Sequence, residues 1–140
     1  MTREDNVEVV RRSFDAFETA DMDAWTADWA PDIVFDVSGY EPFTGEQKLY
    51  RGPTEILEFF GGMMAGVRVL RVHHIEIDAI DDDRVIALYT ETRQEAGGEP
   101  YEVDVGIVYT LAGGRFALVQ VHSSFAAARE TARGSASASA

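Results

Sequence analysis

Seven polar side chains that can exchange protons or bind polar groups interrupt the valine- and isoleucine-rich segments in the second half of the chain. They are His73, His74, Tyr89, Glu91, Arg93, Asp104 and His122. Polar groups inside apolar strands are costly to bury unless they are paired, so such positions are candidates for a functional site. A carboxylate beside an imidazole can poise the histidine as a base near neutral pH, which suits general acid–base catalysis.

The turns between these segments predict which side chains lie opposite one another. Strong turn signals stand at residues 81–83, 97–98 and 113–114. The simplest register places position 73 opposite 91, 91 opposite 104, and 104 opposite 122. The resulting row is an acid–base group if it faces a cavity, and ordinary cross-strand charge pairing if it faces solvent or a dimer partner. A one-residue slip at the last turn would pair Asp104 with Ser123 and turn His122 to the other face.

Asp36 is a further candidate, because it follows an apolar run and precedes Ser38-Gly39, a position typical of pocket mouths. The absence of cysteine excludes thiol nucleophiles, disulfides and zinc–thiolate sites. The adjacent His73 and His74 are expected to point to opposite faces of a strand and so not to share a metal. No glycine pair is followed by a helix, as a phosphate-binding loop would require. We therefore predict no metal and no cofactor.

The length and charge of the chain limit its partners. Its 140 residues fit one domain over residues 1–133, followed by a flexible C-terminal tail at 134–140. A net charge of −13 would repel a phosphate backbone, so nucleic acid is not expected as a partner. No apolar run reaches the roughly 18 residues of a membrane span, and the N-terminus does not read as a secretory signal. We expect a cytoplasmic protein without membrane contact.

The order of the expected elements predicts an α+β fold. An amphipathic helix is expected over residues 3–20, a short helix after Asp21 that presents Trp25 and Trp29, and a third helix from Gly52-Pro53. A short strand is expected at 33–35, and four strands joined by tight turns at 67–79, 84–95, 101–111 and 115–125. A short helix is expected at 126–133. A twisted antiparallel sheet over helices leaves a concave pocket.

Four stretches, taken in order, resemble the SnoaL-like branch of the NTF2-like superfamily. Residues 10–25 resemble its first-helix signature, and Pro31-Asp32-Ile-Val-Phe-Asp follows at the expected distance. Tyr50-Arg51-Gly52-Pro53 and Val108-Tyr-Thr-Leu-Ala-Gly-Gly-Arg complete the pattern, which covers roughly residues 3–130. The resemblance implies a cone-shaped α+β barrel with three N-terminal helices packed on a curved, mainly antiparallel sheet. It also implies an apolar pocket and a homodimer.

The resemblance carries only parts of the known catalytic sets to this chain. Phe14 stands where ketosteroid isomerases have a tyrosine, and Asp36 lies within one residue of their base aspartate. The segment 90–95 resembles the part of limonene epoxide hydrolases that supplies an arginine and an acid, here Arg93 and Glu95. Val121 replaces the remaining aspartate of those enzymes and of polyketide cyclases. Valine cannot transfer a proton, so the polar lining is altered.

We therefore predict a pocket protein for a small hydrophobic molecule, acting as a cofactor-independent, isomerase- or cyclase-like acid–base enzyme on a carbonyl-bearing substrate. Asp36, Asp104 and His122 are the predicted catalytic residues. The predicted substrate-binding residues are Phe14, Phe17, Trp25, Phe60, Tyr89, Glu91, Arg93 and Val121. Two alternatives stay open: a non-catalytic ligand-binding or dimerisation module, and an epoxide hydrolase- or dehydratase-like enzyme using Arg93 and Glu95.

Overall fold

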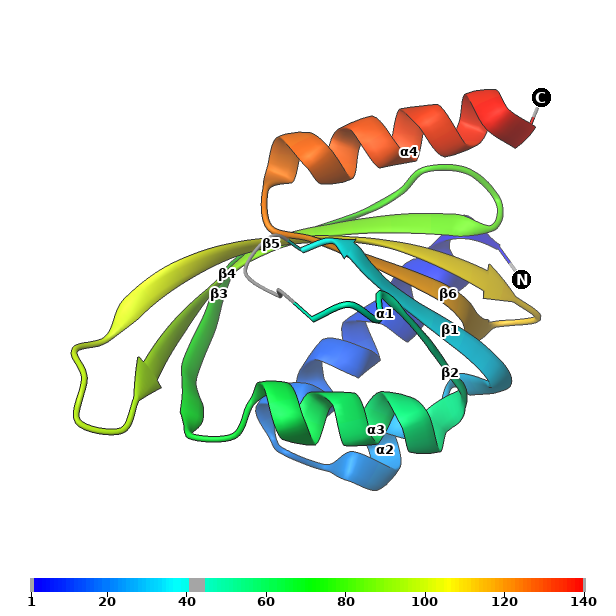
Figure 1. The fold of residues 1–140 in the computed structure, drawn as a ribbon. Helices are drawn as coiled ribbons and strands as arrows, with labels where there is room; N and C mark the ends of the chain where they lie inside the picture. Colours follow the sequence, from blue (N-terminus) through cyan, green and yellow to red (C-terminus); the bar gives the residue numbers. More distant parts are fainter. Residues whose placement is uncertain (1, 41–44, 140) are drawn as a thin grey trace.

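The fold consists of a curved, unclosed mixed sheet with helices on both of its faces (Figure 1). A computed structural model describes residues 2–40 and 45–139. Over these residues the elements are α1 (Arg3–Glu18), α2 (Met22–Thr26), β1 (Trp29–Gly39), β2 (Leu49–Arg51), α3 (Gly52–Met63), β3 (Val67–Ala79), β4 (Arg84–Glu95), β5 (Tyr101–Ala112), β6 (Arg115–His122) and α4 (Phe125–Ser139). In these residues no helix is long and apolar enough to cross a membrane.

The strands are arranged in the order β2-β1-β6-β5-β4-β3. β3, β4, β5 and β6 form the expected antiparallel meander, while β1 runs parallel to β6. The expected α+β class is confirmed. Two details differ from the expected barrel. The sheet ends in the separate edges β2 and β3, and the three expected helices are not one N-terminal block, because β1 and β2 precede α3.

Local sequence explains where the first two helices begin. The hydroxyl of Thr2 accepts a hydrogen bond from the backbone N–H of Asp5 at 3.0 Å, and the carboxylate of Asp5 accepts one from the N–H of Thr2 at 3.0 Å. This capping box satisfies two N–H groups that the helix cannot pair itself. Asp21 caps α2 by accepting from Ala24 N–H at 3.1 Å. Trp29 lies in β1 and not in this helix, contrary to expectation, so β1 is much longer than the expected strand.

The two faces of the sheet are covered by different helices (Figure 1). Helices α1, α2 and α3 lie on one face, which we call the inner face, and α4 lies on the other, the outer face. Gly106 of β5 allows α4 to approach, since a Cβ there would come within 2.5 Å of the Cβ of Ala128. Helix α4 continues to Ser139, through most of the segment expected to be a tail. Its alanine content favours this extension.

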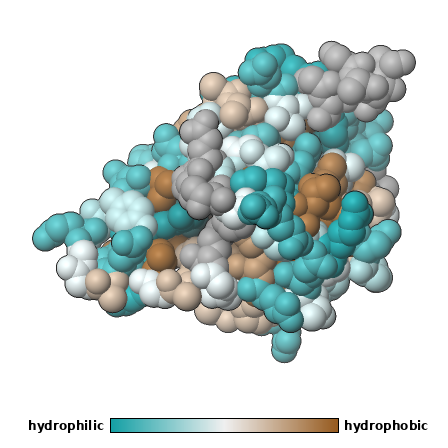
Figure 2. Space-filling view, viewed as in Figure 1, coloured by the Kyte–Doolittle hydropathy of each residue, from teal (hydrophilic) through white to brown (hydrophobic). Residues whose placement is uncertain are grey.

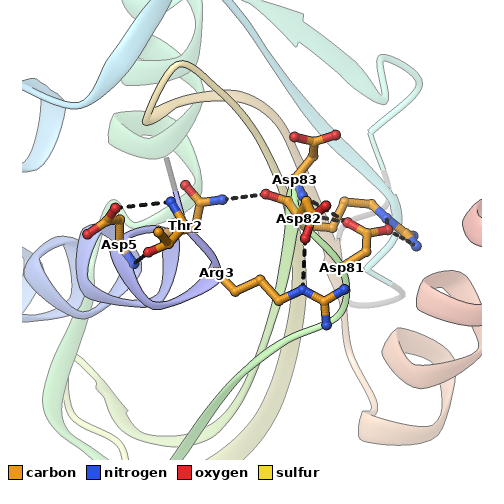
Figure 3. A network of polar contacts seen from close by, with 8 residues as sticks. Thr2, Arg3, Asp5, Asp81, Asp82 and Asp83 are labelled. Atoms are coloured by element: carbon orange, nitrogen blue, oxygen red, sulfur yellow. Dashed lines mark hydrogen bonds and ion pairs between the residues drawn. The ribbon is translucent and has the colours of Figure 1, made fainter.

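The aspartate turn between β3 and β4 joins both helical layers to the sheet. Arg3 of α1 forms an ion pair with Asp82 at 2.9 Å (Figure 3). Arg84, the first residue of β4, donates to Asp81 at 2.9 Å and to the backbone carbonyl of Ala132 in α4 at 2.9 Å. The side chain of Asp82 is exposed, as is usual in a turn, and the turn and the residue after it contact both α1 and α4.

Seen from the same side as Figure 1, the surface is mostly hydrophilic with a few separate apolar patches (Figure 2).

The strand register differs from the expected one, and the difference decides which face each side chain occupies. Glu91 pairs with Val72 and Val103, so it is opposite neither of its expected partners, residues 73 and 104. Asp104 pairs with Thr90, and His122 pairs with Gly106. The expected row of four polar side chains is therefore wrong. Because side chains alternate between faces, a slip of one residue separates Glu91 from Asp104.

Candidate functional site

A cavity of about 90 Å³ lies between the inner face of the sheet and the helices that cover it. Aromatic and aliphatic side chains from α1, α2, α3 and the sheet form most of its wall. Phe14 packs edge-on against Tyr89, and Trp25 packs edge-on against Phe60. All eight predicted substrate-binding residues line this cavity: Phe14, Phe17, Trp25, Phe60, Tyr89, Glu91, Arg93 and Val121. Their contact with a substrate stays a prediction.

One charged cluster breaks this apolar wall. An Arg93 Nη2 hydrogen donates to Glu91 Oε1 at 2.9 Å, and Nη1 donates to the hydroxyl oxygen of Tyr40 at 2.8 Å. The side chain of Glu91 is only 6% exposed and that of Arg93 13%. A buried ion pair of this kind is tolerated because each charge neutralises the other, and the hydrogen bond to Tyr40 satisfies a further part of the guanidinium.

Alternation along β4 explains why one strand supplies most of this cluster. Tyr89, Glu91 and Arg93 are two residues apart, so their side chains project from the same face of the strand into the cavity wall. Tyr40 follows directly after β1, and its backbone N–H donates to the carbonyl of Val37 at 3.0 Å. This turn places the Tyr40 hydroxyl beside Arg93, although β6 and β5 separate β1 from β4 in the sheet.

The surroundings fix the protonation of two members of this group. Burial raises the pKa of the Tyr89 hydroxyl well above its ordinary value, and the charge of Glu91 raises it further. Tyr89 is therefore a neutral O–H donor throughout the physiological range. Burial alone would lower the pKa of Arg93, but the hydrogen bond and charge of Glu91, with Tyr40, outweigh it and raise that pKa. Arg93 stays cationic.

Two atoms of the cluster have no hydrogen-bond partner among the described residues. They are Oε2 of Glu91 and Nε of Arg93, and both are fully buried. One is an acceptor and the other a donor. A buried polar atom without a partner costs about 1–3 kcal/mol, so a bound molecule that satisfied these two atoms would recover that free energy.

The three predicted catalytic residues lie outside this cavity. None of Asp36, Asp104 and His122 is part of its wall. Asp104 is exposed and accepts a hydrogen bond from Thr90 at 3.1 Å. It projects from the same face of β5 as Gly106, which faces α4, so it lies on the outer face. Its predicted catalytic role has no geometric support here.

His122 and Asp36 also lie on the outer face. His122 pairs with Gly106, and its ring packs against Gly39 so closely that a Cβ on Gly39 would overlap it. Burial lowers the pKa of His122, and the nearby charge of Asp36 opposes this effect only in part. Asp36 accepts hydrogen bonds from the backbone N–H of Ser38 at 2.9 Å and from its hydroxyl at 2.6 Å. These contacts stabilise the end of β1.

The remaining candidates are also placed by the structure. The rings of His73 and His74 contact each other, with centroids 4.6 Å apart, so the expectation of opposite faces is wrong. A bulge in β3 and the positive φ of 56° at His74 bring the two rings together.

Over the described part of the chain, no group of three or more histidine, cysteine, aspartate or glutamate residues could hold a metal ion. Glu95 is exposed beside the edge residue Val67 and does not line the cavity.

Tyr40 is not among the candidate functional residues predicted from the sequence. The only sequence signal for it is a tyrosine that follows Gly39 directly after the strand. Nothing in the sequence predicts that this turn would bring the Tyr40 hydroxyl to Arg93, because the contact spans 53 positions in the chain. The predicted pocket-mouth position at Asp36 is four residues away, on the opposite face.

A curved, unclosed sheet with an apolar cavity under a layer of helices is the architecture of the NTF2-like superfamily. The family model of the SnoaL-like domain matches residues 10–119 of this chain. The chain therefore belongs to the SnoaL-like family. An uncharacterized protein of Mycobacterium tuberculosis is 29% identical over 116 residues, which are 82% of this chain and 86% of the relative.

Solved structures of similar proteins support the fold. A candidate polyketide cyclase from Xanthomonas campestris pv. campestris matches with a TM-score of 0.75 and 20% identity, over 91% of this chain and 96% of the other. A candidate isomerase from Bacillus subtilis matches with a TM-score of 0.72 and 20% identity, over 87% and 88% of the two chains. At these identities the likeness establishes the shared fold only.

Proposed function

We propose that the protein is a cofactor-independent acid–base enzyme that moves a proton next to the carbonyl group of a small hydrophobic molecule, as an isomerase or cyclase does. The observation that carries this proposal is the buried Glu91–Arg93 ion pair in the wall of an otherwise apolar cavity, in which Oε2 of Glu91 has no hydrogen-bond partner among the described residues. The candidate cyclase and isomerase among the structural relatives are consistent with it.

In this mechanism Glu91 is the general base. Its carboxylate takes a proton from the carbon beside the substrate carbonyl, the C–H electron pair moves into the new C=C bond, and the carbonyl oxygen becomes an enolate. In an isomerisation the protonated Glu91 returns the proton to a different carbon of a conjugated enolate, and the C=O bond forms again. In a cyclisation the enolate carbon attacks a second carbonyl carbon, the electron pair of that C=O bond moves to its oxygen, and this oxygen takes the proton from Glu91. A positioned carboxylate base contributes about 10²–10⁴-fold to such a step.

Arg93 and Tyr89 stabilise the enolate. The total charge of the site does not change during the first step, because the negative charge moves from Glu91 to the substrate oxygen. Arg93 stays cationic beside both positions, and Tyr89 stays a neutral O–H donor. Donors that are already oriented in a site sheltered from water stabilise a developing oxyanion more strongly than water does.

The proposal is tested by exchange of the α-protons of cyclohexanone for deuterium in D₂O, followed by proton NMR. This probe needs no knowledge of the natural substrate. We expect the protein to accelerate exchange over buffer, and Glu91→Gln to lose that acceleration by about 10²-fold or more. Glu95→Gln is the matched control, because that carboxylate is exposed outside the cavity, and it should behave as the unmodified protein.

Two outcomes would contradict the proposal. If Glu91→Gln exchanges protons as fast as the unmodified protein, Glu91 is not the base. If the unmodified protein binds cyclohexanone without accelerating exchange, the cavity belongs to a non-catalytic binding module.

Light scattering of the same preparation tests the homodimer that the family resemblance implies. A homodimer should give twice the mass of one chain.

A further inference from the structure

The two unpartnered atoms of the charged cluster define what kind of molecule the cavity accepts. Glu91 Oε2 is a hydrogen-bond acceptor and Arg93 Nε a donor, and neither has a partner among the described residues. Both side chains line the cavity, and the Glu91 side chain is 94% buried, because only 6% of it is exposed. A ligand that satisfies both atoms must present a hydrogen-bond donor and a hydrogen-bond acceptor.

The charge of the cluster restricts the ligand further. Glu91 and Arg93 neutralise each other, and Nη1 and Nη2 of Arg93 are already engaged with Tyr40 and Glu91. An anionic ligand would place a second negative charge beside Glu91 in an apolar cavity with only one cation to compensate. Like charges in a poorly solvated site repel strongly. An uncharged ligand avoids this cost.

The size of the cavity limits the ligand to about one ring. Its volume of about 90 Å³ is smaller than the 150 Å³ engineered protein cavity that holds a benzene molecule. Aromatic rings from Phe14, Trp25, Phe60 and Tyr89 line it, so a flat ring has apolar surfaces to contact on several sides.

We propose that the cavity selects uncharged, single-ring compounds that carry an N–H or O–H group directly beside a carbonyl, such as lactams, cyclic imides and cyclic hydroxy ketones, and that it rejects the corresponding carboxylates. The N–H or O–H donates to Glu91 Oε2, and the carbonyl oxygen accepts from Arg93 Nε. This inference rests on the site of the proposed function and names the class of ligand that the site recognises, in which the N–H or O–H takes the position of the C–H whose proton Glu91 removes from a substrate. The donor group anchors the ring edge, so that the carbonyl lies against the arginine.

The test compares three single-ring probes by isothermal titration calorimetry. 2-Pyridone has an N–H beside a carbonyl, N-methyl-2-pyridone lacks the N–H, and benzoate is an anion. A probe of this size binds with a dissociation constant of roughly 1 mM when it fits well. We expect 2-pyridone to bind at least tenfold more tightly than N-methyl-2-pyridone and than benzoate. Equal binding of all three probes, binding that favours benzoate, or no saturable binding of 2-pyridone would overturn the proposal.

The substitution Glu91→Gln should reverse the ligand preference of the cavity. This substitution removes the negative charge and leaves Arg93 as an uncompensated cation, so benzoate should now bind more tightly than 2-pyridone. An unchanged preference in a folded Glu91→Gln protein would overturn the charge argument. Far-ultraviolet circular dichroism confirms folding, and the series on the unmodified protein decides the question even where the variant does not fold.

The result can be separated from that of the proton-transfer test. The three probes report binding alone, so the ligand preference can fail while cyclohexanone exchange succeeds, which would leave the enzyme assignment standing. Equally, the preference can hold while no exchange is catalysed, which would identify the cavity as a binding site for this class of compound without catalysis.

Discussion

Replacing Tyr40 with phenylalanine tests whether the contact between the end of β1 and the ion pair is energetically important. The change removes only the oxygen that accepts the hydrogen bond from Arg93 Nη1 at 2.8 Å. Tyr40 is 4% exposed, so water does not readily replace that oxygen. Hydrogen bonds to charged groups contribute about 1.5–3 kcal/mol, and we expect the free energy of unfolding to fall by about that amount.

The assay is urea unfolding followed by tryptophan fluorescence, since Trp25 and Trp29 both line the cavity. The matched control is Tyr50→Phe. The Tyr50 hydroxyl donates to the neutral backbone carbonyl of Gln47 at 3.1 Å, away from the ion pair. Loss of a neutral bond should cost about 0.5–1.5 kcal/mol. If Tyr40→Phe costs no more than Tyr50→Phe, the charge-assisted bond is not what holds Arg93 in place and the reasoning is refuted.

Three further predictions concern packing, protonation and the cation. Gly106→Ala should lower the free energy of unfolding by about 1–3 kcal/mol, because the new Cβ would collide with Ala128. The control is Gly61→Ala on helix α3, where a Cβ meets no other atom, so this change should be neutral or stabilising. Chemical denaturation of both variants measures the difference. Burial lowers the pKa of His122, so the unfolded chain binds its proton more readily. Stability should therefore fall as pH drops below about 6.5 towards the folded-state pKa, and His122→Asn should flatten that slope in denaturation at several pH values. Arg93→Lys should slow cyclohexanone exchange at least tenfold, because an ammonium cannot reproduce the fork of the guanidinium; equal rates would show that charge alone suffices.

Element order and type could be predicted from the sequence because local signals specify them. The period of apolar residues, Gly52-Pro53 and the tight turns predict α1, α3 and the meander, and the structure confirms all of them. The length of β1 and the parallel pairing of β1 with β6 could not be predicted. They depend on contacts between segments more than 80 positions apart, for which a single sequence carries no signal.

Only part of the site could be predicted, because the sequence specifies which side chains of one strand share a face but not how neighbouring strands are aligned. Alternation along β4 correctly groups Tyr89, Glu91 and Arg93 on one face, because that grouping depends only on positions within one strand. Placing Asp104 and His122 beside Glu91 required the register between strands, which an error of one residue inverts. Alternation therefore predicts the faces within a regular strand such as β4, but neither at the bulge of β3, where the rings of His73 and His74 meet, nor across strands.

The arrangement of the cluster also limits the chemistry that it can support. Phe14 and Val121, which the family resemblance aligns with a tyrosine and an aspartate of other enzymes, both line the cavity as apolar side chains. Its charge is concentrated in Glu91 and Arg93, whose burial is tolerable only while they remain paired. A negative charge that leaves Glu91 must therefore stay close to Arg93. This favours a reaction in which the negative charge passes from the Glu91 carboxylate to a substrate oxygen beside the same arginine, as in enolate formation, over one that releases a free anion into the cavity.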